Sequence, residues 1–158
     1  MERKHIKAVI RPLIITLLAW PMALQAADDP AAAAADSVLQ QAREATSRQD
    51  FAAAAALLRD ALAKTPANPD YHNLYAYAVR KGPQPNMDLV FKHYNEALRL
   101  APKHRGAHEY IGEAYLSVGN VHKAREHLTQ LDRICFFGCE EYSSLKKAIR
   151  EYEAKGAR

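Results

Sequence analysis

The sequence has 158 residues, of which 49% are hydrophobic and 25% are charged, a composition typical of one folded domain with its own core. Lys and Arg number 22 against 18 Asp and Glu, but the first 26 residues hold four of these cations and one acid, so the remainder carries 18 against 17. Mixed charges of this kind exclude the basic stripe that a nucleic-acid-binding surface needs, and we expect no nucleic-acid partner.

Residues 1–26 have the pattern of a secretory signal peptide. A basic head precedes a short apolar run at 13–20, and Leu24-Gln25-Ala26 is an acceptable cleavage site. The alternative is a membrane anchor, but the run is shorter than the roughly 20 apolar residues that a spanning helix needs. No cysteine follows the run to carry a lipid. We therefore expect export, most naturally to a bacterial periplasm, as a soluble protein without stable membrane insertion.

The next segment, 27–35, is an Ala-rich leader with too little apolar bulk to pack, although it can fray into the first helix. From residue 36 onwards, apolar residues recur at the 3.6-residue period of amphipathic helices. The predicted helices are 36–48, 51–64, 70–81, 87–100, 105–117, 121–134 and 140–155. No stretch of useful length has a strand pattern, so the predicted fold class is all-α.

The first six helices form three pairs with a common pattern of small residues, which would let the two backbones of a pair approach closely. These residues are Ala42 with Ala54, Ala76 with Val90, and Gly112 with Ala124. The second pair is two residues longer between these places, and the extra residues fall in the turn sequence 82–85. Asp50, Asn86 and Asn120 fall where the second helix of each pair should begin, and all three are good N-cap residues.

This pattern resembles the tetratricopeptide repeat (TPR), which has a bulky residue, Leu-Gly and Tyr on its first helix, then Ala, an aromatic residue and a late Pro on its second. In the last pair these places hold His108, Ile111-Gly112, Tyr115, Ala124, Leu128 and Phe136. The resemblance implies a right-handed α-solenoid in a domain spanning 36–158. Its three helix-turn-helix repeats cover about 35–68, 69–104 and 105–138, with a C-terminal capping helix at 140–155. Phe136 in place of Pro indicates that the array ends there.

The resemblance also implies a concave groove, lined by the first helix of each repeat, that binds a peptide segment of another protein. Carried over one by one, its positions are Leu39, Arg43, Thr46, Asn73, Tyr77, Arg80, Lys81, Glu109, Tyr110, Glu113 and Leu116. We expect Asn73 to bond an extended backbone and Arg80 to hold a partner's carboxylate in its fork, while Tyr77 and Tyr110 supply rigid contact area.

Chaperone-binding members of the family grip a terminal carboxylate with Lys and Asn at five fixed places. Here those places hold Leu39, Arg43, Leu74, Gly106 and Tyr110. We therefore do not expect that ligand, and the fold resemblance supports a partner protein without identifying it.

Cys135 and Cys139 are the only cysteines and flank Phe136-Phe137-Gly138 ahead of the capping helix. In an oxidising compartment we expect a disulfide, for which Gly138 would have to break the helix. The alternative is a thiol-redox or metal-handling pair. It lacks the Cys-x-x-Cys spacing, and two ligands alone close no metal site.

Other candidates for chemistry are weaker. His104 and His108 lie one helical turn apart, but His108 occupies a packing position, so we expect a core or groove histidine rather than a metal ligand. No serine lies in a Gly-x-Ser-x-Gly setting. The chain is thus expected to be a non-enzymatic scaffold without cofactor or metal.

Overall fold

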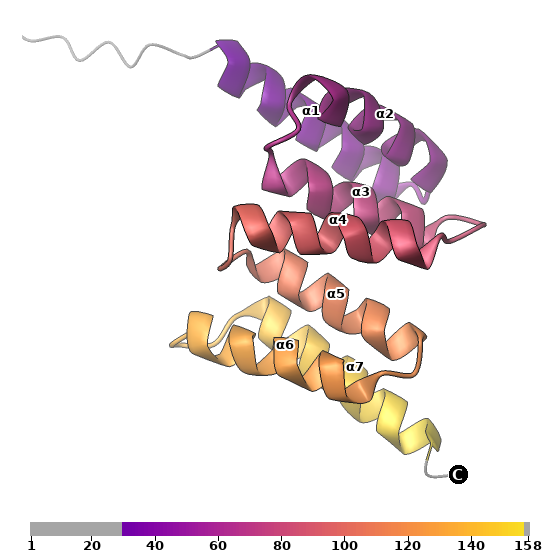
Figure 1. Cartoon of the computed structure of the whole chain (residues 1–158), viewed down its shortest axis with the longest axis vertical. Helices are drawn as coiled ribbons and strands as arrows, with labels where there is room; N and C mark the ends of the chain where they lie inside the picture. Colours follow the sequence, from indigo (N-terminus) through magenta and orange to yellow (C-terminus); the bar gives the residue numbers. More distant parts are fainter. Residues whose placement is uncertain (1–29, 157–158) are drawn as a thin grey trace, which may run out of the picture.

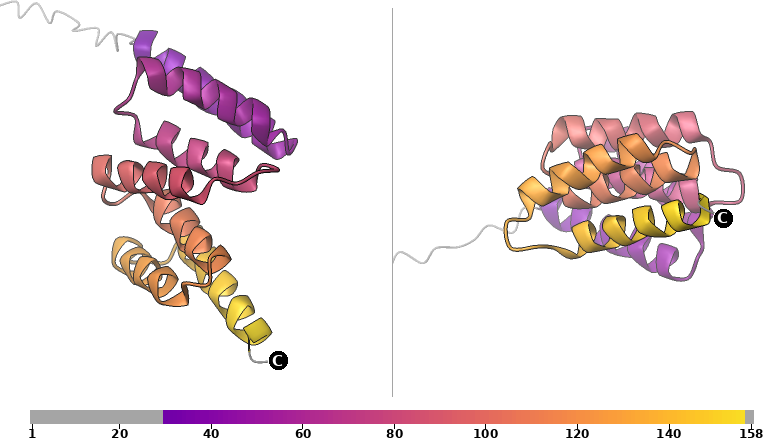
Figure 2. Two further views of the ribbon diagram at one scale, coloured as in Figure 1. Left: turned by 45° about the vertical axis from the view of Figure 1, so that its right-hand side comes forward. Right: turned by 90° about the horizontal axis from the view of Figure 1, so that it is seen from below.

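The structure, a computed structural model, describes residues 30–156, and this part of the chain is all helical, without a strand (Figure 1). Three helix pairs stack one after another. They are α1 (Pro30–Ser47) with α2 (Phe51–Lys64), α3 (Pro69–Lys81) with α4 (Met87–Leu100), and α5 (Arg105–Ser117) with α6 (Val121–Ile134). The seventh helix, α7 (Glu140–Gly156), follows α6 and closes the lower end of the stack (Figure 2). The predicted all-α solenoid of three helix pairs and a capping helix is confirmed.

The first helix begins earlier in the chain than the predicted start at residue 36. Helix α1 begins at Pro30, so most of the predicted leader at 27–35 is helical, and Ala35 packs against the first core cluster. The predicted signal peptide lies outside the described residues. Within 30–156, no helix combines the length and the hydropathy needed to span a bilayer.

Local sequence signals set where the helices begin and end. Asp50, Asn86 and Asn120 each accept a hydrogen bond from the backbone N–H three residues later, at 3.0–3.1 Å. An N-cap of this kind stabilises a helix by about 1 kcal/mol. The longer loop of the second repeat lies at 82–86, between α3 and α4, and leaves both helices intact.

The helices pack through the small residues that the repeat pattern predicts, and all six are buried. They are Ala42, Ala54, Ala76, Val90, Gly112 and Ala124. At Gly112, an added Cβ would come within 2.6 Å of the Leu145 side chain. Glycine at this position therefore allows α7 to lie directly against α5.

The chain turns from α6 into α7 through a short loop closed by a disulfide. Gly138 has φ +83°, a left-handed conformation that favours glycine, and it interrupts the helix as predicted. Cys135 and Cys139 are joined, with their Cα atoms 5.6 Å apart. The loop displays Phe136 and Phe137, which are 87% and 97% exposed.

Candidate functional site: a pocket across the first helices of the repeats

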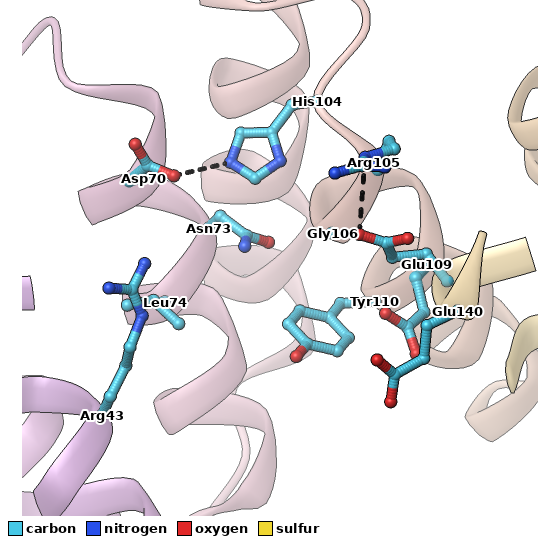
Figure 3. A pocket seen from close by; sticks show the side chains of 11 residues that line it. Arg43, Asp70, Asn73, Leu74, His104, Arg105, Gly106, Glu109, Tyr110 and Glu140 are labelled. Atoms are coloured by element: carbon cyan, nitrogen blue, oxygen red, sulfur yellow. Dashed lines mark hydrogen bonds and ion pairs between the residues drawn. The ribbon is translucent and has the colours of Figure 1, made fainter. Parts of the chain in front are cut away.

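A pocket of about 520 Å³ opens on the face that α1, α3, α5 and α7 share (Figure 3). Helix α1 contributes Arg43 from its second half, whereas α3, α5 and α7 contribute residues of their N-terminal halves. The lining consists of Arg43, Asp70, Asn73, Leu74, His104, Arg105, Gly106, Glu109, Tyr110, Glu140 and Glu141. Four of the predicted groove residues are therefore brought together: Arg43, Asn73, Glu109 and Tyr110.

Asn73 is a buried amide without a hydrogen-bond partner. Its side chain is 5% exposed, and Oδ1 is shut off from solvent with no bonding partner among the described residues. Gly106 lies opposite, where an added Cβ would come within 3.3 Å of Asn73 Nδ2. A buried polar group left unpaired costs about 1–3 kcal/mol, so its presence here requires an explanation.

One rim of the pocket is fixed by His104, the N-cap of α5. Its Nδ1 accepts a hydrogen bond from the Ala107 N–H at 3.2 Å, so the ring hydrogen lies on Nε2, which donates to Asp70 Oδ1 at 3.1 Å. This bond lowers the pKa of Asp70. Because both ring nitrogens are engaged, the His104–Asp70 pair joins α5 to α3 and leaves no nitrogen free to act as a base.

The end of the pocket formed by α5 and α7 is acidic. Glu109, Glu140 and Glu141 lie there, and Arg105 Nε is 3.5 Å from Glu141 Oε1. Burial raises the pKa of Glu109 to about 7, with further contributions from the neighbouring carboxylates, although a hydrogen bond from Ser144 opposes the shift. Near neutral pH, this carboxyl is therefore about half protonated.

Tyr110 forms part of the pocket wall and packs against the Tyr77 ring, with 4.7 Å between the ring centroids and the planes tilted by 42°. Burial raises the pKa of Tyr110 to about 12. Tyr77 also meets Phe51 edge-on at 6.3 Å and does not line the pocket. Tyr77 therefore lies behind Tyr110 and supports it, and does not itself form the pocket surface.

Known proteins resemble the chain in structure and not detectably in sequence. No protein-family model and no curated protein matches it. The TPR domain of Sgt2 from Aspergillus fumigatus matches with a TM-score of 0.65 and 21% identity, over 77% of this chain and 78% of that one. The type III secretion translocator chaperone SycD from Yersinia enterocolitica, in an alternative dimer, matches with a TM-score of 0.66 and 12% identity, over 78% and 94%. The fold is that of a TPR protein.

Within this TPR fold, Arg80 does not take the position predicted for it. Its guanidinium donates to Glu113 Oε2 at 2.7 Å, and its side chain is 10% exposed. The Arg80 guanidinium, which the sequence predicts to hold a partner's carboxylate, thus binds a glutamate of the next repeat. Lys81 stays exposed, with its Nζ 5.8 Å from the centre of the Tyr77 ring.

Three further groove predictions also differ from the structure. Leu39 and Leu116 are buried in core clusters, because each faces a neighbouring helix of the array rather than the pocket. The Thr46 hydroxyl donates to the Ala42 carbonyl at 2.7 Å and is not part of the pocket wall.

The second and third repeats each contain a pair of histidines that joins their two helices. His108 Nε2 lies 3.0 Å from the Pro102 carbonyl, and His108 Nδ1 lies 3.0 Å from His127 Nδ1. Because a carbonyl accepts, Nε2 carries the hydrogen of His108, and His127 donates to Nδ1. His108 is therefore a core histidine, as predicted.

The same arrangement occurs one repeat earlier. His72 Nε2 lies 2.8 Å from the Pro66 carbonyl, and His72 Nδ1 lies 2.8 Å from His93 Nδ1. Each pair joins the two helices of its repeat. The signal was present in the sequence, because both prolines are followed six residues later by a histidine.

Proposed function

We propose that this TPR protein is a non-enzymatic scaffold that binds an extended peptide segment of another exported protein at the pocket. The observation that carries the proposal is Asn73, a buried residue of the pocket lining whose Oδ1 has no hydrogen-bond partner among the described residues. An extended backbone offers the N–H and C=O groups that such an amide needs. SycD, one of the structural matches, is a translocator chaperone, which supports a protein as the partner class.

The predicted site residues divide into two sets under this proposal. Arg43, Asn73, Glu109 and Tyr110 line the pocket and would contact the partner. Tyr77, Arg80 and Glu113 would hold the wall in place behind Tyr110, through the contact of the two tyrosine rings and the partly buried ion pair. Lys81 lies at the edge of this support.

A displayed library of random peptides, selected on the purified protein, tests the proposal. We expect Asn73→Ala and Tyr110→Ala to weaken binding of the selected peptides by at least about tenfold, the effect of a moderate hot spot. Lys92→Ala, an exposed change on α4, is the control and should bind as the parent does. Binding that survives both pocket changes but is lost in the Lys92 variant would place the interface elsewhere.

A second candidate, a thiol-redox or metal-handling protein, has one observation in its favour. The ligand atoms of Cys135, Cys139 and Glu141 lie within 4.8 Å of one another. With the sulfurs joined, however, the cysteines offer no thiolate, so reduction would have to precede metal binding. Counting thiols before and after mild reductant separates the two functions. A disulfide that resists reduction favours the scaffold, and a readily cycled pair favours the second candidate.

The proposed location is the periplasm, after removal of residues 1–26. Trp20 is the sole tryptophan of the sequence, so the processed protein would contain none. We expect the native protein to emit as tyrosine when excited at the absorbance of aromatic residues. Tryptophan emission from the purified native protein would show that the segment is retained.

A further inference from the structure

We propose that the pocket selects a cationic side chain of its partner, an ammonium or a guanidinium, at the end formed by α5 and α7. This inference rests on the proposed function and names the class of segment that the pocket takes. Within the part of the chain that the structure describes, two independent observations support it: carboxylates without an ion-pair partner at that end, and the unpaired Oδ1 of Asn73 in the same pocket.

At the acidic end of the pocket, some carboxylates have a cationic partner and others have none within residues 30–156. Arg105 pairs with Glu141, and Arg80 is committed to Glu113 on the neighbouring wall. Among the described residues, no Lys, Arg or His forms an ion pair with Glu109 or Glu140. These two acids therefore line the pocket without an ion-pair partner in the described part of the chain.

Glu109 shows the consequence of this arrangement most directly. Its half-buried carboxyl has a pKa raised to about 7, first by burial and then by the neighbouring acids. The charged or titratable groups that interact with it are Tyr110 and Glu113 on α5, Tyr77 on α3, and Glu140 and Glu141 on α7. Arg105 of α5 lines the same pocket. Ser144 of α7 supplies the one neutral hydrogen bond. A cation placed beside Glu109 would restore the charged carboxylate, because an opposite charge within about 4–6 Å favours ionisation.

Asn73 supplies the second observation. Its Oδ1 is a buried acceptor without a donor among the described residues, so it has the same requirement for N–H groups as the carboxylates of the same pocket. A ligand rich in donors is therefore complementary to this part of the pocket, whereas a carboxylate is not.

Arg43 gives the site a direction. In Figure 3, Arg43 lies on one side of the pocket and Glu109 and Glu140 lie on the other, with Asn73 and Tyr110 between them. The protein is thus electrostatically polar across the pocket. A segment bound there would place its cation toward α7, with any acidic residue toward α1.

Short peptides of matched sequence test the inference. The probes are acetylated and amidated pentapeptides, Ala-Ala-X-Ala-Ala, in which X is Lys, Arg, Gln or Glu. They are titrated into isotope-labelled protein while the side-chain amide resonance of Asn73 is followed. We expect the Lys and Arg peptides to shift this resonance with a Kd at least about fivefold lower than that of the Gln peptide. The Glu peptide should bind most weakly, and added salt should reduce the differences.

Two variants and the pH dependence provide the controls. Glu109→Gln should abolish the preference for Lys over Gln, while Glu151→Gln, an exposed change on the same end of the molecule, should leave it intact. The affinity of the parent for the Lys peptide should rise between pH 6 and pH 8, as Glu109 loses its proton, and that of Glu109→Gln should not.

Several outcomes would overturn the inference, and they can be told apart from failure of the proposed function. Equal binding of the Lys and Gln peptides at Asn73 removes the cation preference but leaves a segment-binding pocket. A Lys peptide that binds without shifting the Asn73 resonance, or no binding by any peptide, also refutes the inference. In these last cases, the library-selected peptides and the Asn73→Ala variant still decide the proposed function independently.

Discussion

His72 and Asn73 are neighbours in the chain and both are buried, yet they face different surroundings. Both ring nitrogens of His72 have partners, Nδ1 at His93 of α4 and Nε2 at the Pro66 carbonyl in the loop before α3. Asn73 lines the pocket, where its Oδ1 has no partner among residues 30–156. We call these the paired side and the pocket side of α3. The contrast indicates that the paired side contributes to stability, whereas the pocket side keeps its bonding capacity for a ligand.

The largest expected effect comes from Arg80, which we predict to behave as a structural residue. Arg80→Met removes the cation from the buried pair and leaves Glu113 without a partner, at an expected cost of about 3 kcal/mol in the free energy of unfolding. Urea denaturation measures this, and Lys81→Met, an exposed change beside it, is the near-neutral control. A stable Arg80 variant that binds no peptide would instead assign Arg80 to the pocket side.

The next largest effect is acid destabilisation through the paired side. Burial lowers the pKa of His93 and of His127 to about 4, from an unfolded value of 6.5. Their folded rings stay neutral while the unfolded rings take up protons, so stability is full above pH 6.5 and falls as the pH drops toward 4. Allowing for solvent at these half-buried rings, we expect a total loss of about 2 kcal/mol.

Denaturation midpoints at pH 7.5 and pH 4.5 measure this loss, but other groups also titrate in this range. His72 and Lys92 depress the pKa of His93 and Glu96 opposes them. The corresponding neighbours of His127 are His108, Lys123 and Glu126. Glu109 has the opposite sign, because its raised pKa makes the fold gain stability as the pH falls from about 7. The informative quantity is therefore the difference between the parent and a variant that lacks the histidines.

The first repeat suggests such a variant. Val38 and Leu57 occupy the places that the histidine pairs take in the later repeats, and both pack against the first core cluster. We expect His93→Leu alone to cost about 1–2 kcal/mol, because His72 then loses a partner. The double change His72→Val/His93→Leu should return stability at pH 7.5 to near that of the parent and remove part of the acid loss. If the double variant lost as much free energy of unfolding as the two single variants together, the two histidines would contribute to stability independently rather than as a pair.

The smallest expected effect belongs to the pocket side. Replacing Asn73 with Leu, which is similar in shape, removes an amide that has no partner to lose. We expect the free energy of unfolding to change by less than about 0.5 kcal/mol, or to increase, while affinity for selected peptides falls. Asn120→Leu is the matched control. It removes an amide that caps α6 and should cost about 1 kcal/mol. If Asn73→Leu destabilised the fold as much, Asn73 would be a structural residue.

The fold could be predicted because its determinants are local and repeated. Asp50, Asn86 and Asn120 mark helix starts within a few residues of chain, and small residues such as Ala76 and Gly112 mark helix contacts at a recurring place. Each signal was available several times in one sequence. The start of α1 was less well defined, since an alanine run has helix propensity but no periodic apolar stripe to mark its boundary.

The pocket could be predicted only in part. The repeat register placed Arg43, Asn73, Glu109 and Tyr110 on one face, and the structure brings them together. The register could not show that Arg80 forms an ion pair with Glu113, because this pair joins two repeats and depends on how far both side chains extend. Nor does any pattern reveal that an amide lacks a partner, since that fact depends on everything around it.

The close contact between Gly112 and Leu145 bears on how the molecule behaves at high concentration. A stack of helix pairs ends in an apolar face, and such a face on one copy is complementary to the opposite end of another. In this chain, Leu145 and Ile149 of α7 cover that face from within. The surface that remains outside carries Lys147 and Glu151, charges of both signs. Because Gly112 has no side chain, α7 can lie close enough to cover this face, and we expect the covered end not to stack on the opposite end of another copy.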